Sequence, residues 1–74
     1  MLTEREKEVL ELLCKGLTNS EIAEILIVTP HTIKAHVMSI LKKFNVPNRT
    51  LAACYAIKNN LVNEKKSNQK SNSQ

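Results

Sequence analysis

The sequence of 74 residues has no aspartate, a single glycine, two prolines, one tyrosine and one phenylalanine. A glycine-rich phosphate-binding loop cannot be built from one glycine. No serine or cysteine is accompanied by the placed base that a catalytic nucleophile requires. We therefore expect neither an enzyme nor a cofactor-binding protein.

Cysteine and long apolar runs are scarce as well. Cys14 and Cys54 lie far apart in the chain and form no pair at metal-ligand spacing, which argues against a disulfide framework and a metal site. The longest apolar run, residues 25–28, is too short to cross a bilayer. The first residues, MLTEREKEV, are too charged for a signal peptide. We expect one cytoplasmic domain with no membrane partner.

Charge is distributed unevenly along the chain. Residues 1–27 hold six glutamates against three basic side chains, whereas residues 28–62 hold five basic side chains and no acid. An acidic first part followed by a basic second part is typical of a protein with one surface that faces a polyanion. A mildly basic solvated surface gives the same pattern, so charge alone leaves both interpretations open.

Two copies of the capping-box pattern T-x-x-E, at residues 3–6 and 18–21, predict the starts of two helices. The first helix should run from about Glu4 to Lys15 and end at Gly16, because glycine readily adopts the left-handed conformation after a helix. The second has room for only about two turns.

The pair Thr29–Pro30 is typical of an N-cap followed by the first helical residue, and it predicts a third helix from Pro30 to about Phe44. Only Ile27 and Val28 separate the second helix from this cap. Two helices joined by so short a turn indicate a helix-turn-helix unit.

The third helix has two distinct faces when it is drawn at 3.6 residues per turn. The face predicted to be core contains Ile33, Val37, Ile40, Leu41 and Phe44. The opposite face contains His31, Lys34, Ala35, Met38 and Lys42. No acid occurs in this helix, so its outward face suits an anion.

Asn48 predicts the cap of a fourth helix that runs to about Asn59. One apolar stripe of this helix should close the core and comprises Ala52, Ala53, Ala56, Ile57 and Leu61. A second stripe, with Leu51, Cys54 and Tyr55, has no partner within the chain, and such surfaces on small domains mark interfaces. The predicted fold class is therefore all-α, a compact four-helix domain over residues 1–62. Residues 63–74 contain no apolar side chain and are expected to form a disordered tail.

The segments LTEREKEVL, GLTNSEIA, TPHTIKAHVMSILKKF and NVPNRTLA occur together, in this order. From Leu2 to Val62 the chain resembles the DNA-binding domain of LuxR-type (NarL/FixJ) bacterial transcription regulators. The resemblance implies that the third helix enters the major groove of double-stranded DNA and that the fourth helix forms a homodimer. It also implies an N-terminal sensor or receiver domain, which this chain does not contain.

Carried over by position, the resemblance implies base contacts by Lys34, Ala35 and Met38, and we expect His31, near the start of the same helix, to join them. It implies phosphate contacts by Asn19, Ser20, Thr32, His36, Lys42, Lys43 and Arg49. The homodimer interface would use Leu51, Cys54, Tyr55 and Lys58. Many relatives carry a second cation at the position of Met38, and we expect an apolar side chain there to meet a thymine methyl group instead of guanine.

Several alternatives remain open at this stage. Lys34, Asn19 and Ser20 would also be ordinary solvent-exposed residues outside a DNA-binding motif. We expect Arg49 to pair with a carboxylate of the first helix such as Glu6, with phosphate contact as its alternative role. At the level of the whole protein, the alternatives are a protein-interaction module using the fourth helix and a sigma-factor-like promoter-reading domain. The segment NVPNRTLA favours the LuxR type over the latter.

Overall fold

The computed structural model describes residues 1–62, and it contains four helices in this part of the chain. They are α1 (Glu4–Cys14), α2 (Asn19–Leu26), α3 (Pro30–Phe44) and α4 (Arg49–Lys58). The predicted all-α, four-helix class is confirmed, and each helix begins where its cap predicted. The tail predicted for residues 63–74 lies outside the described residues.

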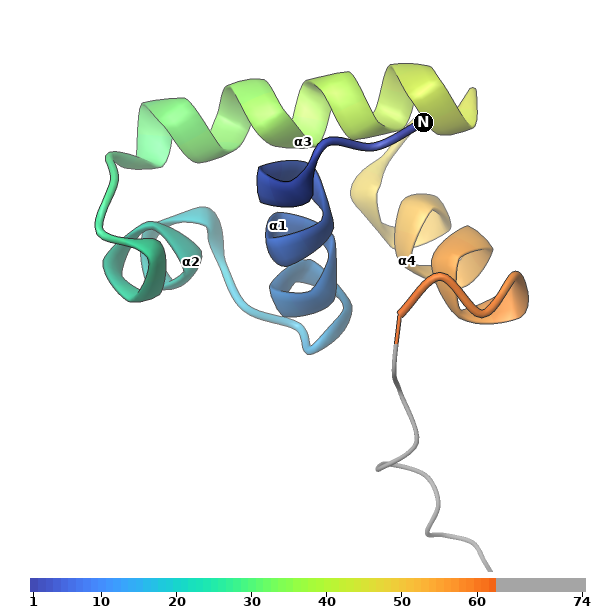
Figure 1. Ribbon diagram of the computed structural model, residues 1–74, viewed down its shortest axis with the longest axis horizontal. Helices are drawn as coiled ribbons and strands as arrows, with labels where there is room; N and C mark the ends of the chain where they lie inside the picture. The colour runs from blue at the N-terminus through green and yellow to red at the C-terminus, as the bar shows by residue number, and fades with distance from the viewer. Residues whose placement is uncertain (63–74) are drawn as a thin grey trace, which may run out of the picture.

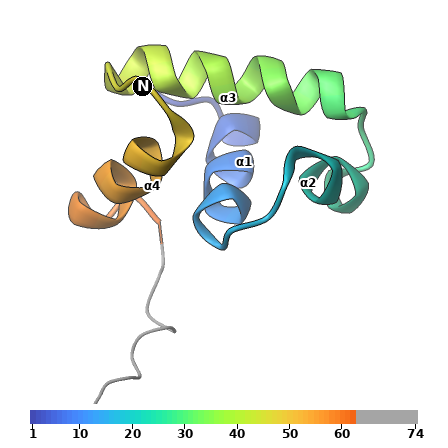
Figure 2. The same ribbon diagram turned by 180° about the vertical axis from the view of Figure 1, so that it is seen from behind.

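The helix α3 lies across one side of the molecule, and the other three helices lie beneath it (Figure 1). Helix α1 occupies the centre, contacts each of the other helices, and separates α2 at one end from α4 at the other. The view from behind shows the same arrangement (Figure 2). One long face of α3 is therefore left uncovered by the rest of the fold.

Side-chain caps begin all four helices. In the first capping box, Thr3 Oγ1 accepts a hydrogen bond from the Glu6 N–H at 3.1 Å, and Glu6 Oε1 accepts one from the Thr3 N–H at 3.0 Å. The second box, at residues 18–21, has the same reciprocal bonds. Thr29 caps α3 and Asn48 caps α4 through single bonds of this kind. Because each bond satisfies a backbone donor left without a helical partner, each cap contributes about 1 kcal/mol.

The core collects small and branched apolar side chains from all four helices. Its buried members are Val9, Leu10, Leu13, Ile22, Ala23, Ile33, Val37, Ile40, Ala52 and Ala56. The residues at the centre of each predicted core face are thus confirmed as buried, but residues at the margins of these faces are more exposed than predicted. Leu41 and Phe44 are only half-buried. Ile57 and Leu61, expected to extend the core stripe of α4, are 40% and 48% exposed, so that expectation was wrong. The buried residues of α4 are Ala52 and Ala56, and Leu61 lies beyond the end of the helix at Lys58.

The turn between α2 and α3 depends on an unusual residue. Ile27 adopts the left-handed conformation, with φ 58° and ψ 51°, and its side chain is 88% exposed. Here the N–H of Val28 reaches back to the carbonyl oxygen of Ala23 at 3.0 Å, which closes the end of α2. A β-branched side chain is strained in this conformation, whereas asparagine tolerates it, as it does at Asn45 and Asn60.

We predict that Ile27→Asn raises the free energy of unfolding by about 1 kcal/mol, because it relieves this strain and removes almost no buried surface. Urea denaturation followed by circular dichroism measures the change. The reciprocal control, Asn45→Ile, should lower the free energy by a similar amount at a left-handed position with the same φ of 58°. An unchanged or lower midpoint for Ile27→Asn would contradict the prediction.

Candidate nucleic-acid interface

The uncovered face of α3 carries the residues that the sequence placed there. His31, Lys34, Ala35, Met38 and Lys42 are all exposed, and the Met38 side chain is 59% exposed. The buried residues of α3 lie on the opposite face. A rod-like helix with an uncovered, acid-free face has the shape and charge needed to enter the major groove of a duplex.

The N-terminus of α3 adds an anion-attracting end to this face. Its first turn has no acid, and the unpaired backbone N–H groups of a helix start carry partial positive charge. The Thr32 N–H donates to Thr29 Oγ1, and the two threonine hydroxyl oxygens lie 3.0 Å apart. Both hydroxyls keep further hydrogen-bonding capacity. His36 is half-buried one turn further along the helix.

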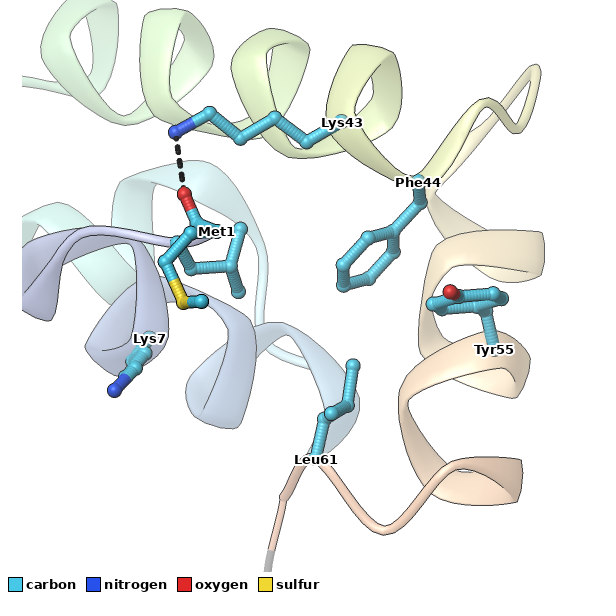
Figure 3. A pocket seen from close by; sticks show the side chains of 7 residues that line it. Met1, Lys7, Lys43, Phe44, Tyr55 and Leu61 are labelled. Carbon is cyan, nitrogen blue, oxygen red and sulfur yellow. Dashed lines mark hydrogen bonds between the residues drawn. The ribbon is translucent and has the colours of Figure 1, made fainter.

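Helix α3 is held in place by a buried carboxylate of α1. Glu6 is only 5% exposed, and its Oε2 accepts a bond from Ser39 Oγ at 2.6 Å. Its Oε1 accepts from Lys43 Nζ at 2.8 Å and from the backbone of Thr3. Lys43 Nζ also donates to the Met1 carbonyl oxygen at 3.1 Å (Figure 3). The capping box of α1 and the second half of α3 therefore share one carboxylate.

These bonds outweigh the cost of burying the charge. Burial alone would raise the pKa of Glu6, but the hydrogen bonds from Lys43, Ser39 and the Thr3 backbone, together with the charge of Lys43, lower it from 4.5 to about 2. Glu6 is thus a carboxylate in the folded protein at neutral pH. Sequence reasoning recognised Glu6 as a capping residue and as a partner for Arg49, and it did not single out Ser39. The sequence did contain a signal for this network: Ser39 and Lys43 have i, i+4 spacing, which puts both donors on one side of α3, beside its core face.

The expected ion pair between Arg49 and Glu6 is wrong. Lys43 occupies Glu6, and the guanidinium of Arg49 instead donates to Asn19 Oδ1 at 2.7 Å and to the Leu17 carbonyl oxygen at 2.9 Å. Arg49 opens α4, so its side chain reaches the start of α2 and not the start of α1. The structure thus brings together Asn19, Ser20 and Arg49, three predicted phosphate contacts, around a shallow hollow at the N-terminus of α2.

The two adjacent lysines at the end of α3 differ in their surroundings. The ammonium group of Lys43 donates hydrogen bonds to Glu6 and to the carbonyl oxygen of Met1, and the Lys43 side chain is 34% exposed. Lys42 is exposed on the outward face. Both remain predicted phosphate contacts, but the geometry makes Lys42 the better placed of the two.

The predicted interface residues of α4 share one side of that helix. Leu51, Cys54, Tyr55 and Lys58 are all exposed and follow i, i+3 and i+4 spacing. The Tyr55 ring also contacts Phe44, with ring centroids 4.5 Å apart, so Tyr55 is partly used within the chain.

Two negative findings apply to residues 1–62. No group of histidine, cysteine or acidic side chains in this range is arranged to hold a metal ion. None of the helices formed there is long and apolar enough to cross a membrane.

Comparison with known proteins agrees with this geometry. Residues 1–56 match the family described as bacterial regulatory proteins, luxR family. Over 62 residues, the chain is 52% identical to the transcriptional regulatory protein LiaR of Bacillus subtilis and 50% identical to the response regulator protein VraR of Staphylococcus aureus. These alignments cover 84% of this chain but only 29% and 30% of the relatives, so the chain spans less than a third of their length. A solved structure of the transcription factor GerE superposes with a TM-score of 0.78 over 84% of this chain and 92% of GerE, at 24% identity, which supports the fold.

The lowered pKa of Glu6 predicts a specific loss of stability in acid. Because the unfolded chain takes up this proton near pH 4.5 and the folded chain only near pH 2, the stabilisation is complete above pH 4.5 and is lost as the pH falls through about 2. The loss should be about 3 kcal/mol of unfolding free energy. Urea denaturation at a series of pH values measures it.

The matched controls are two glutamine variants. Glu6→Gln should flatten this part of the pH profile, whereas Glu11→Gln, at an exposed position of the same helix, should leave it unchanged. An acid slope in Glu6→Gln equal to that of the unmodified chain would contradict the assignment.

Proposed function

The chain belongs to the luxR family of bacterial regulatory proteins, and from this premise we propose that it binds double-stranded DNA in transcription regulation. The observation that carries the proposal is the uncovered, acid-free face of α3 within a helix-turn-helix. The buried Glu6 network supports it, because a helix that reads base edges must be held at a defined position on the domain. The family match favours the LuxR type over the sigma-factor-like alternative.

We propose that base contacts come from the first half of α3. A recognition helix presents its N-terminal residues to base edges, and Lys34 stands at the centre of the exposed face there. Its ammonium group can donate to guanine O6 and N7. Ala35 and Met38 add apolar surface that suits thymine methyl groups, and His31 lies at the entering end of the helix.

Phosphate contacts would flank these base contacts. Lys42 stands toward the far end of α3, and Thr32 and His36 lie along its sides. The N-terminus of α2, with Asn19, Ser20 and Arg49, offers backbone donors and a cation. Lys43 contributes charge at the same end of α3 as Lys42, but its first role in this proposal is to hold the helix.

We further propose that two copies bind DNA as a symmetric dimer through α4. The exposed side of Leu51, Cys54, Tyr55 and Lys58 is apolar along most of its length, and a self-complementary patch of this kind suits a twofold axis. Such a dimer would present two recognition helices to half-sites about one helical turn apart. Because LiaR and VraR are about three times as long as this chain, we also propose that a receiver domain acts with it in the complete regulator.

The proposal predicts that duplex binding weakens steeply as salt rises, because lysine–phosphate contacts release counterions from DNA. Lys42→Ala should weaken binding to all sequences and make the slope of log affinity against log salt shallower by about 1. Fluorescence anisotropy with a labelled duplex measures both. Lys43→Ala is the matched control. It should mainly lower the free energy of unfolding, because it leaves the buried carboxylate of Glu6 without its cationic partner. Affinity that does not change with salt would instead favour the protein-interaction alternative.

Base readout by Met38 predicts a change of preferred sequence. In selection from a random duplex pool, Met38→Arg should move the preference at one position toward guanine, because arginine binds guanine O6 and N7 in a bidentate manner. Lys34→Ala, selected in parallel, should weaken the original site by about 1–3 kcal/mol. If the sites selected by Met38→Arg and the unmodified chain are identical, Met38 does not contact bases.

A further inference from the structure

One end of the molecule has an apolar protrusion that the fold does not use. Ile27 is 88% exposed and Ile25 is 54% exposed, although both are large apolar side chains. Glu21 and Glu24 lie beside them on the outward side of α2, opposite its buried residues. We name these four residues the α2 knob. Ile27 is also held in a strained backbone conformation, so folding stability does not account for isoleucine at this position.

The other end of the molecule has an apolar groove. It lies between the N-terminal segment, the end of α3 and α4, and has a volume of about 250 Å³. Figure 3 shows Phe44 and Tyr55 next to each other on one side of it, Leu61 below them and Met1 on the other side. We name it the α4 groove, and its lining is Met1, Leu2, Lys7, Lys43, Phe44, Tyr55 and Leu61. Two of these side chains are basic and none is acidic.

The knob and the groove are complementary in polarity and charge. The knob offers branched aliphatic side chains next to two carboxylates, and the groove offers an apolar hollow with the exposed ammonium group of Lys7 at its edge. The other basic side chain of the lining, Lys43, is bonded to Glu6 and Met1. The carboxylates of the knob would be repelled by DNA phosphates, which makes a protein surface the better partner. The Lys7–Glu4 pair is exposed and 3.5 Å long, and such pairs exchange partners at little cost.

We propose that the α2 knob of one copy of this chain inserts into the α4 groove of a second copy. Because the two surfaces are different, each pairing leaves one knob and one groove unused, and further copies can add head to tail. The contact goes beyond the proposed DNA binding and does not require it.

The positions of the two surfaces leave the DNA-binding face accessible. Helices α2 and α4 lie at opposite ends of the molecule beneath α3, so neither contact covers the outward face of α3 (Figure 1). If the proposed DNA binding holds, the head-to-tail contact gives cooperative occupation of neighbouring sites. The groove shares Tyr55 with the proposed symmetric dimer, whereas Leu51 belongs to the symmetric surface alone.

The test is sedimentation velocity without DNA, over protein concentrations up to the millimolar range. Every protein carries Leu51→Glu, which removes the symmetric contact and lies outside the knob and the groove. This protein should still associate as its concentration rises. Ile27→Asn should damage the knob, and Leu61→Glu should place a repelling acid in the groove. Each should weaken association about tenfold or more, because each removes apolar surface from the contact.

Mixing the two variants distinguishes a head-to-tail contact from a symmetric one. The Ile27→Asn protein keeps its groove and the Leu61→Glu protein keeps its knob, so an equal mixture should form a heterodimer that cannot grow further. Ile27→Asn should also be more stable than its parent, so its loss of association cannot come from unfolding. Circular dichroism verifies the fold of Leu61→Glu.

Three outcomes would overturn the proposal. They are a Leu51→Glu protein that stays monomeric at every concentration, association that survives both groove and knob variants, and a mixture no heavier than its separate components. None of these depends on DNA, so they leave the proposed function to its own test.

Discussion

The carboxylate of Glu6 joins the start of one helix to the middle and end of another. It closes the capping box of α1 and accepts bonds from Ser39 and Lys43 of α3. A buried carboxylate is costly unless its oxygens are satisfied, so α3 must lie where both donors can reach it. Rotation or sliding of α3 along α1 would leave a buried charge without partners. This constraint explains how a domain with a small core of aliphatic side chains keeps its longest helix in one position.

Holding α3 from one side has a functional consequence for the other side. The buried residues Ile33, Val37 and Ile40 and the Glu6 network use the inner face and one edge of the helix. The outward face is left for a ligand, and all of its charges are positive. Lys42 and Lys43 show the division within two consecutive residues: one ammonium group is available to a polyanion, and the other is bonded to the fold.

The uneven charge along the chain has a second consequence at the ends of the molecule. The acids of α2 lie at one end, next to exposed isoleucines, whereas basic side chains border the apolar groove at the other. The central position of α1 keeps these surfaces apart (Figure 1). A surface of opposite character at each end suits contacts between copies, while the uncovered face of α3 between them suits DNA. The small size of the domain allows these surfaces to coexist, because nearly every helix has one buried and one accessible side.

Local sequence patterns were sufficient for the four helix starts and the two faces of α3, because caps and helical periodicity act over three or four residues. The tertiary structure alone decided that Lys43, and not Arg49, pairs with Glu6, and that Ile57 and Leu61 lie outside the core. It also placed Ile27 in the left-handed conformation. These outcomes depend on how the helices cross, and the crossing results from many weak contacts between residues far apart in the chain. The chain thus encodes its helices locally, and their packing determines which charges and apolar groups remain available for binding.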